Sequence, residues 1–373
     1  MTNTSSRLQS LDVFRGLTVM IMTLVNNPGD WGHIYPPLEH AAWNGCTVAD
    51  LVFPSFLFIV GVSIVFAMQT AKQQPENHGK LITKVLKRAL IIACLGLFMS
   101  IFLNWDFSTL RFPGVLQRIA VVYLICGLIF IKSGYRFQAL LAVVILIVYH
   151  LLITQVPVPG TGVASLQPET NLGAWLDRRV FSTAHLWSQS KTWDPEGLLS
   201  TLPAIATGLL GILTGTWLKQ QTYSPKIKVY AMLAAGALLV ATGLIWNIWL
   251  PINKALWTSS FVFFTGGLGL LILTLCYWLI DIEGYQGAIK PFVVYGVNAI
   301  TVFVISGLAA RSMNRIMVNH EGSKTSLSNA LYQQFFSPHL SPNNASLAWA
   351  VAYVLVWTII LWVMYNKRIF IKI

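Results

Sequence analysis

The sequence predicts an all-α, polytopic membrane protein with about ten transmembrane helices. Of its 373 residues, 55% are hydrophobic and only 10% are charged, whereas ordinary soluble domains are about 25% charged. The apolar residues form long runs, such as 51–68 and 232–250, and about 18 such residues are enough for a helix to cross a bilayer. Because backbone groups inside hydrocarbon must find hydrogen-bond partners within their own segment, these runs are predicted to be helices.

The apolar runs locate each predicted span to within a few residues. No internal repeat of about 20–50 residues is visible, so residues 1–373 are predicted to form a single domain. The predicted spans are 12–27, 49–69, 86–103, 114–132, 137–154, 198–218, 228–250, 256–280, 291–310 and 346–366.

Basic residues orient these spans in the membrane. With a cytoplasmic N-terminus, 16 of the 25 Lys and Arg lie on the inner side and nine of the 13 Asp and Glu on the outer side. Cytoplasmic loops carry the excess of Lys and Arg, so we predict a multi-pass protein of the inner (cytoplasmic) membrane with both termini cytoplasmic. The net charge of +12 is then an orientation signal, and no nucleic-acid partner is needed to explain it. The inner residues are Arg7, Arg15, Lys72, Lys80, Lys84, Lys87, Arg88, Lys132, Arg136, Lys219, Lys226, Lys228, Lys290, Lys367, Arg368 and Lys372.

Three predicted outer segments are longer than turns: 28–48, 155–197 and 311–345. The second contains Pro157 and Gly160 and has the composition of an ordered loop rather than a low-complexity linker. Six of the seven histidines fall on or near the outer side, so chemistry is predicted there. The four cysteines lie far apart without C-x-x-C spacing, and no metal is predicted.

The first predicted helical hairpin, residues 11–69, carries the most informative polar residues. Asn26 ends its first helix, Asp50 begins its second, and His40 lies between them. This set suits acyl transfer, because an imidazole can take a proton from an amine, a carboxylate can orient the imidazole and an Asn amide can stabilise an oxyanion. The structural alternative makes His40 an interfacial histidine and Asp50 the N-cap of the second helix.

The stretches RLQSLDVFRG, VNN and EHAAWNGCTVADLVFP in this hairpin resemble the heparan-α-glucosaminide N-acetyltransferase family and its bacterial relatives. The resemblance covers nearly the whole chain, since further matches follow in RFPGVLQR (111–118), WDPEG (193–197), PINKALWTSSFV (251–262), GVNAI (296–300) and the tail KRIFIKI. It implies one transmembrane acyltransferase domain over residues 1–373, with 11–69 as the catalytic hairpin and 155–197 as an ordered outer loop.

The family transfers acetyl from cytosolic acetyl-CoA to the terminal glucosamine of a glycan on the far side of the membrane. By this resemblance, His40 matches the active histidine and Asn26 the active-site asparagine. Asp50 is the expected partner of the imidazole. Trp43 and Asn44, which follow His40 closely, are assigned to substrate binding.

Two arginines of RFPGVLQR are further candidates for substrate binding. Arg111 and Arg118 are seven residues apart and so share one face of a helix. Arg118 lies within an apolar run, where an unpaired guanidinium costs on the order of 3 kcal/mol. It is therefore expected to face the protein interior with a partner, for which Asp50 or Asp106 is available. An ion pair that only joins helices is an equally good explanation.

Arg15, Lys87 and Arg88 are assigned to binding of the CoA phosphates and nucleotide. The alternative is that they serve only as cytoplasmic orientation signals.

The sequence thus predicts an acetyl-CoA-dependent N-acetyltransferase that acts on glucosamine or a terminal glucosamine residue at the outer side. The partners are acetyl-CoA, the amino-sugar acceptor and the lipid bilayer, and a homodimer stays open. Two rivals remain: a proton-coupled amino-sugar transporter, and an acyltransferase acting on an envelope polysaccharide. Whether His40 is a general base or carries the acetyl group is also open.

Overall fold

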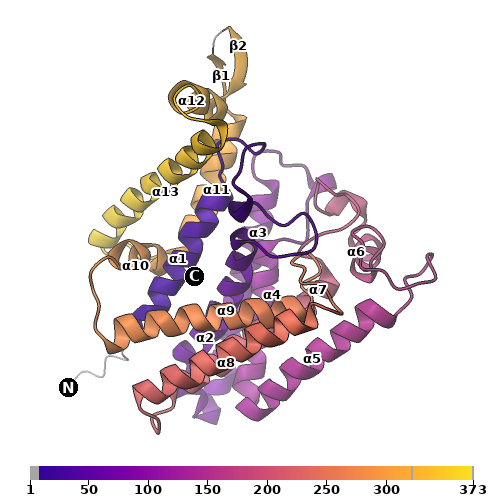
Figure 1. The fold of residues 1–373 in the computed structure, drawn as a ribbon, viewed down its shortest axis with the longest axis vertical. Coiled ribbons are helices and arrows are strands. Elements are labelled where there is room, and N and C mark those ends of the chain that lie inside the picture. The colour runs from indigo at the N-terminus through magenta and orange to yellow at the C-terminus, as the bar shows by residue number, and fades with distance from the viewer. Residues whose placement is uncertain (1–7, 321, 372–373) are drawn as a thin grey trace. The chain divides into compact units, whose positions relative to one another are not determined.

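The computed structural model describes residues 8–320 and 322–371; Arg7 and Lys372, two of the predicted inner basic residues, lie outside them. The described chain is mostly helical, with one two-stranded hairpin, β1 (Met317–His320) and β2 (Ser323–Ser326). The α-helices are α1 Gln9–Val25, α2 Val48–Lys72, α3 His78–Ile101, α4 Val115–Lys132, α5 Tyr135–Gln155, α6 Leu172–Phe181, α7 Leu198–Lys219, α8 Pro225–Trp246, α9 Ser259–Cys276, α10 Lys290–Val297, α11 Ala299–Arg315, α12 Leu327–Phe335 and α13 Pro342–Asn366 (Figure 1).

Seven helices of the described chain are long and apolar enough to cross a membrane: α2, α4, α5, α7, α8, α13, and α9 with its π-helical continuation to Ile282. The pair α10 and α11 makes an eighth if it counts as one span, although it bends by 83°. The other two predicted spans correspond to α1, which has only 17 residues, and α3, which carries four basic residues in its first half. The structure therefore supports a polytopic helical membrane protein with seven or eight spans, and the predicted number of ten is not confirmed.

The chain divides into two compact units. The first contains residues 8–40, 47–52 and the described part of 276–372, and the second contains 41–46 and 53–275. The first unit holds α1 and α10 to α13, and the second holds α3 to α9 and most of α2. Whether the whole chain acts as one acyltransferase domain stays a prediction.

Glycines allow the helices of the second unit to pack backbone against backbone. A Cβ on Gly61 of α2 would lie 2.0 Å from the carbonyl oxygen of Gly208, and one on Gly211 of α7 would lie 2.0 Å from that of Phe58. Helices α8 and α9, side by side in Figure 1, meet in the same way at Gly236. Small residues at helix interfaces are typical of membrane proteins, because helices gain little from apolar burial within lipid.

In the first unit, the LDVFRG and GVNAI motifs form one helix interface. A Cβ on Gly16 would lie 1.7 Å from the oxygen of Phe292, and one on Gly296 would lie 2.0 Å from the oxygen of Asp12. Any larger residue would separate α1 from α10. Two stretches that are distant in sequence thus lie in direct contact.

Asn298 makes the break between α10 and α11. Its backbone leaves the helical region, with φ −120° and ψ 30°, and its amide binds the C-terminal tail. Nδ2 donates to the oxygen of Ile369 at 3.3 Å, and Oδ1 accepts from the backbone N–H of Ile371 at 3.1 Å. The GVNAI motif and the tail are therefore joined by hydrogen bonds at the bend.

Two of the predicted outer segments contain regular structure. Segment 155–197 includes α6, whose N-cap Asn171 accepts a hydrogen bond from the N–H of Ala174 at 2.8 Å. Segment 311–345 contains the β1–β2 hairpin and α12, which lie together next to the end of α11 in Figure 1. Ser326 caps α12 by accepting from the N–H of Asn329 at 3.2 Å.

The orientation of the chain stays a prediction, and cysteine labelling can test it. A membrane-impermeant maleimide applied to intact cells should label Val163→Cys and Lys324→Cys, whereas Gln74→Cys and Lys226→Cys should react only after permeabilisation. All four side chains are exposed. They are preferred over glycine positions in the same loops because Gly162 and Gly322 have φ of +74° and +79°, which strains any other residue.

The labelling should be done with the four native cysteines replaced by serine, since Cys94 is exposed. Labelling of Gln74→Cys in intact cells would reverse the orientation.

Candidate active site

The structure brings His40 and Asp50 together in the first unit. Nδ1 of His40 lies 2.7 Å from Oδ1 of Asp50. The Asp50 side chain is only 1% exposed, whereas that of His40 is 47% exposed. A buried carboxylate therefore holds one nitrogen of a half-exposed imidazole. If Nδ1 carries the proton and donates it to Asp50, the lone pair of the ring lies on Nε2.

Asp50 also fixes the start of α2, although not as the predicted N-cap. Helix α2 begins at Val48, so Asp50 occupies its third position. Oδ2 of Asp50 reaches back and accepts from the backbone N–H of Thr47 at 3.1 Å and from its hydroxyl at 3.2 Å. This is the capping-box arrangement, in which the third residue of a helix satisfies the N–H of the cap. The two carboxylate oxygens of Asp50 thus have different partners: Oδ1 contacts His40, and Oδ2 accepts from Thr47 at the start of α2.

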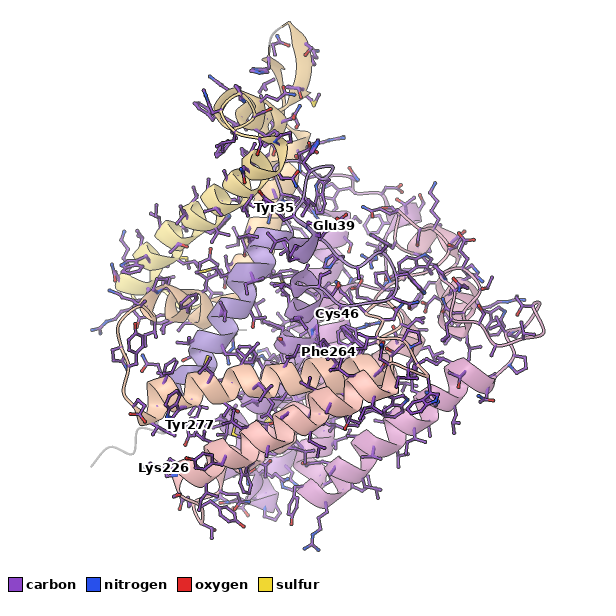
Figure 2. The ribbon with its side chains drawn as sticks, in the orientation of Figure 1. Tyr35, Glu39, Cys46, Lys226, Phe264 and Tyr277 are labelled. Atoms are coloured by element: carbon purple, nitrogen blue, oxygen red, sulfur yellow. The ribbon has the colours of Figure 1, made fainter. Side chains whose placement is uncertain are left out.

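The same cap organises the chain around His40. The hydroxyl of Thr47 donates to the oxygen of Glu39 at 2.7 Å, and this bond ties the residue before His40 to the start of α2. Figure 2 labels Glu39 in the segment that follows α1. His40 is therefore held by its side chain and, through Glu39, by its backbone.

Asn26 lies at the end of α1, as predicted. It is the C-cap residue, its backbone N–H donates to the oxygen of Met22 at 3.1 Å, and its side chain is exposed. Within the described residues no hydrogen bond joins its side-chain amide to the His40–Asp50 pair. A role for this amide toward an oxyanion stays a prediction.

The prediction that Arg111 and Arg118 share one helix face is wrong, because α4 begins only at Val115 and Arg111 lies in the loop before it. From that loop, Arg111 binds the acidic residues of WDPEG. Its Nε and Nη2 lie 2.8 Å and 2.6 Å from the two carboxylate oxygens of Asp194, and Nη2 lies 2.5 Å from Glu196. Burial alone would lower the pKa of Arg111, but the hydrogen bond to Asp194 and the charge of Glu196 outweigh it and raise the pKa. The fork geometry suits an ion pair of this kind, and it joins two family motifs within the second unit.

Arg118 is 2% exposed inside α4, as the sequence predicts for an arginine in a span. Its partners are the oxygen of Gly197, at 2.9 Å, and the hydroxyl of Ser200. Of the acidic partners proposed from the sequence, Asp106 instead accepts hydrogen bonds from its neighbours Ser108 and Thr109. The guanidinium also lies 5.1 Å from the ring of Trp257, a favourable cation–π contact in a water-poor site.

Trp43 and Asn44 both have structural partners in the second unit. The indole N–H of Trp43 donates to the oxygen of Leu166 at 3.0 Å. Asn44 accepts from Nδ2 of the buried Asn253 at 3.1 Å, in the PINKALWTSSFV motif. Asn253 in turn accepts from the N–H of Leu256 at 2.8 Å, so this motif fixes the chain next to Trp43.

A small pocket lies in the second unit beside these residues. The Trp43 ring meets that of Trp193 edge to face at 5.1 Å, and both line the pocket. Arg111 and Arg118 hold two further lining residues, Asp194 and Ser200, in place. The lining includes Trp43, Tyr149, Asn171, Asp177, Trp193, Asp194 and Ser200.

The residues assigned to CoA binding differ in the contacts that they already make within the protein. Arg15 lies in the first unit and donates to Asp12 at 3.0 Å and to the oxygen of Gly296 at 3.3 Å. Lys87 and Arg88 lie in the second unit on α3. Lys87 is exposed, and Arg88 lies over the ring of Tyr123, 5.1 Å from its centroid, with its buried Nε unpaired. Arg88 is therefore the more available of the two arginines.

The sequence did not reveal two residues that line this pocket, Asp177 and Ser200, or Asn253, which binds Asn44. Asp177 is one acidic residue in a loop without a motif, and nothing in the sequence shows that it is buried. Ser200 carries only a hydroxyl. Asn253 does lie in a family motif, which could have drawn attention to it.

No group of three or more His, Cys, Asp and Glu suited to a metal ion occurs among residues 8–320 and 322–371.

The fold and these residues define a class of protein, namely a polytopic helical membrane protein with a carboxylate-oriented histidine and a separate aromatic and acidic pocket. The model of the family "Heparan-alpha-glucosaminide N-acetyltransferase, catalytic" matches residues 7–251. The chain therefore belongs to this family.

Two curated relatives are similar to nearly the whole chain. The heparan-alpha-glucosaminide N-acetyltransferase of Mus musculus is 28% identical and covers 100% of it, and that of Homo sapiens is 29% identical and covers 98%. The chain spans about three fifths of the relatives' own length, 61% and 60% respectively.

Proposed function

We propose that this protein is a membrane N-acetyltransferase that transfers acetyl from cytosolic acetyl-CoA to the amine of glucosamine or of a terminal glucosamine residue at the outer side. The observation that carries this proposal is the His40–Asp50 contact of 2.7 Å in a chain of this family. The names of the two curated relatives support the choice of acetyl group and acceptor.

The geometry of the pair supports a proton-transfer role for His40. The amine nitrogen attacks the thioester carbonyl carbon, the carbon–sulfur bond breaks, and CoA leaves as a thiolate. The nitrogen becomes positively charged as the neutral amine adds to the carbonyl, and Nε2 of His40 accepts its proton and then supplies it to the thiolate. Asp50 stabilises the imidazolium that exists between these two steps. Asn26 is proposed to donate to the oxyanion of the tetrahedral intermediate.

The pocket of the second unit is proposed to bind the sugar. Trp43 and Trp193 offer large, rigid aromatic surfaces, and Tyr149 and Asn171 add polar groups to the lining. Arg111 and Arg118 would act through Asp194 and Ser200 rather than by direct contact, and Asn44 through Asn253.

Acetyl-CoA binding can be tested without turnover. Saturating acetyl-CoA should raise the Tm of the purified protein, because a ligand at 100 times its Kd stabilises the native state by about 2.7 kcal/mol. Arg88→Ala should reduce this shift, since Arg88 has an unpaired donor. Lys84→Ala is the matched control, because Lys84 is exposed on the same helix. Absence of both a Tm shift and a calorimetric signal would remove acetyl-CoA from the proposal.

The activity itself is tested by incubating detergent-purified protein with radiolabelled acetyl-CoA and a panel of amino sugars, with mass spectrometry of the products. An N-acetylated amino sugar is the expected product. Proteoliposome uptake of labelled glucosamine without acetylation would favour the transporter instead. Acetylation of a polysaccharide but of no amino sugar would favour an acyltransferase that acts on an envelope polysaccharide.

A further inference from the structure

Asp177 is a buried carboxylate without an ion-pair partner among the residues that the structure describes. It lies on α6, is 2% exposed and lines the pocket of the second unit. Its one hydrogen bond comes from the backbone N–H of Leu198, 2.9 Å from Oδ1. Buried carboxylates normally have a charged partner or several donors, so this residue is short of partners.

The neighbouring arginines do not fill that place. Arg118 and Arg178 act on Asp177 only through longer-range charge. Arg118 donates to Gly197 and Ser200, and Arg178 donates to backbone carbonyl oxygens of residues 169 and 192 at 2.9 Å and 2.6 Å.

The other carboxylate that lines the pocket is already neutralised. Both oxygens of Asp194 accept from Arg111. Asp177 is thus the carboxylate of the lining that remains available to a cation.

The position of Asp177 is built into the start of α7. A Cβ on Gly197 would lie 1.9 Å from Oδ2 of Asp177, so glycine in the WDPEG motif makes room for this carboxylate. The N-terminus of α7 favours its negative charge, and the bond to Leu198 fixes its orientation.

The other walls suit an ammonium group as well. Trp43 and Trp193 meet at 5.1 Å with planes at 78°, and Tyr149 lines the same pocket. Aromatic faces next to a carboxylate are the usual surroundings of a bound ammonium.

We propose that Asp177 is a specificity-determining residue that forms an ion pair with the protonated amine of the acceptor, so that the pocket selects amino sugars over neutral sugars. This inference rests on the proposed function for the identity of the acceptor. No bond is made or broken at this binding step; the ammonium then releases one proton to solvent and becomes the neutral amine that attacks.

The proposal predicts that the affinity for an amino sugar falls at low pH, whereas protonation of the ligand alone would raise it. Burial, and to a smaller degree the charge of Asp194, raise the pKa of Asp177 to about 6, while the bond from Leu198 and the charges of Arg118 and Arg178 oppose this rise. Below about pH 6 the carboxyl of the free protein is neutral, so the affinity for an amino sugar should fall. The amine of the ligand becomes more protonated over the same range, which alone would act in the opposite direction.

The test is equilibrium binding of labelled glucosamine and glucose, without acetyl-CoA, to the wild type, Asp177→Asn and Glu169→Gln. The wild type should prefer glucosamine by about 10- to 100-fold, the range expected for a buried charge pair. Asp177→Asn should bind the two sugars within about threefold, since Asn can still accept from Leu198 and so preserve the fold. Glu169 is exposed, and its Gln variant should behave as the wild type.

An unchanged preference for glucosamine in Asp177→Asn, or equal binding of the two sugars by the wild type, would overturn the inference. If the variant does not fold, the wild type alone decides: from pH 7.5 to 5 its glucosamine affinity should fall several-fold, by at most about tenfold for a pKa of about 6, while its glucose affinity stays constant. If the wild type acetylates amino sugars but does not prefer glucosamine to glucose in binding, the inference about Asp177 is wrong and the proposed function stands. If Asp177→Asn loses the preference for glucosamine but the wild type acetylates no amino sugar, the proposed function is wrong and the inference about Asp177 stands.

Discussion

Replacing His40 by alanine should reduce the rate of acetyl transfer by about two to four orders of magnitude, the range for a positioned proton-transfer group. The physical reason is that the half-exposed imidazole of His40 is oriented by a buried carboxylate, 2.7 Å from its Nδ1. The fold and acetyl-CoA binding should survive, because the imidazole is 47% exposed and contributes little packing. The measurement is kcat with saturating acetyl-CoA and acceptor, together with the Tm.

His33→Ala is the matched control for this variant. Nδ1 of His33 also contacts a carboxylate, Asp30, at 2.6 Å, but both side chains of that pair are more than two fifths exposed. A solvated pair contributes little to orientation, so this variant should retain its activity. A fully active His40→Ala protein would leave the function resting on the family alone.

Intact-mass analysis of the wild type mixed with acetyl-CoA alone separates the two mechanisms that the pair permits. An added acetyl group that is absent from His40→Ala indicates a covalent relay. An unmodified protein that nevertheless transfers acetyl to an amino sugar indicates direct transfer with His40 as general base.

The sequence was sufficient to predict the parts of the fold that depend on hydrophobicity along the chain. Helices α2, α7 and α9 are continuous apolar runs, and their existence follows from composition. The bend at Asn298 was not predicted, because it depends on hydrogen bonds to a tail about 70 residues further along the chain. An apolar run on both sides of an asparagine looks like one span.

At the site, the sequence predicted residues better than it predicted pairs. His40 and Asp50 are ten residues apart in adjoining segments, so their proximity could be expected, and the structure shows the contact. Arg111 and its acidic partners are 83 and 85 residues apart. The sequence alone therefore showed two separate motifs and no contact between them.

Asp177 shows what sequence patterns omit. Nothing local distinguishes it from an exposed aspartate of a loop, because its burial results from the packing of α6 against the start of α7. The clue that existed was Gly197, but a glycine in a motif does not reveal which atom occupies the space beside it.

The capping role of Asp50 makes Asp50→Asn a sharper test than it would be for a simple N-cap. Its two oxygens serve different donors, Oδ1 the imidazole of His40 and Oδ2 the N–H of Thr47. An amide has one oxygen and one NH2 group, so Asn can accept from only one of them. If the helix keeps the oxygen, the NH2 group faces Nδ1 and favours the wrong tautomer of His40, with the proton on Nε2.

Asp50→Asn should therefore lower kcat by about two to four orders of magnitude, approaching the roughly 10⁴-fold loss known for this change in a histidine–aspartate pair. The KM for acetyl-CoA should stay within about threefold, and stability should fall by no more than about 2 kcal/mol, the range for a lost cap. Thr47→Ala separates the two tasks of Asp50. It removes the hydroxyl, with its bonds to Glu39 and Asp50, but leaves the backbone N–H of Thr47 and both carboxylate oxygens, so the His40–Asp50 contact should persist and the rate loss should stay below about tenfold. Equal rate losses in Asp50→Asn and Thr47→Ala would show that Asp50 acts only through the cap that it shares with Thr47, and His40 would then need no orienting carboxylate.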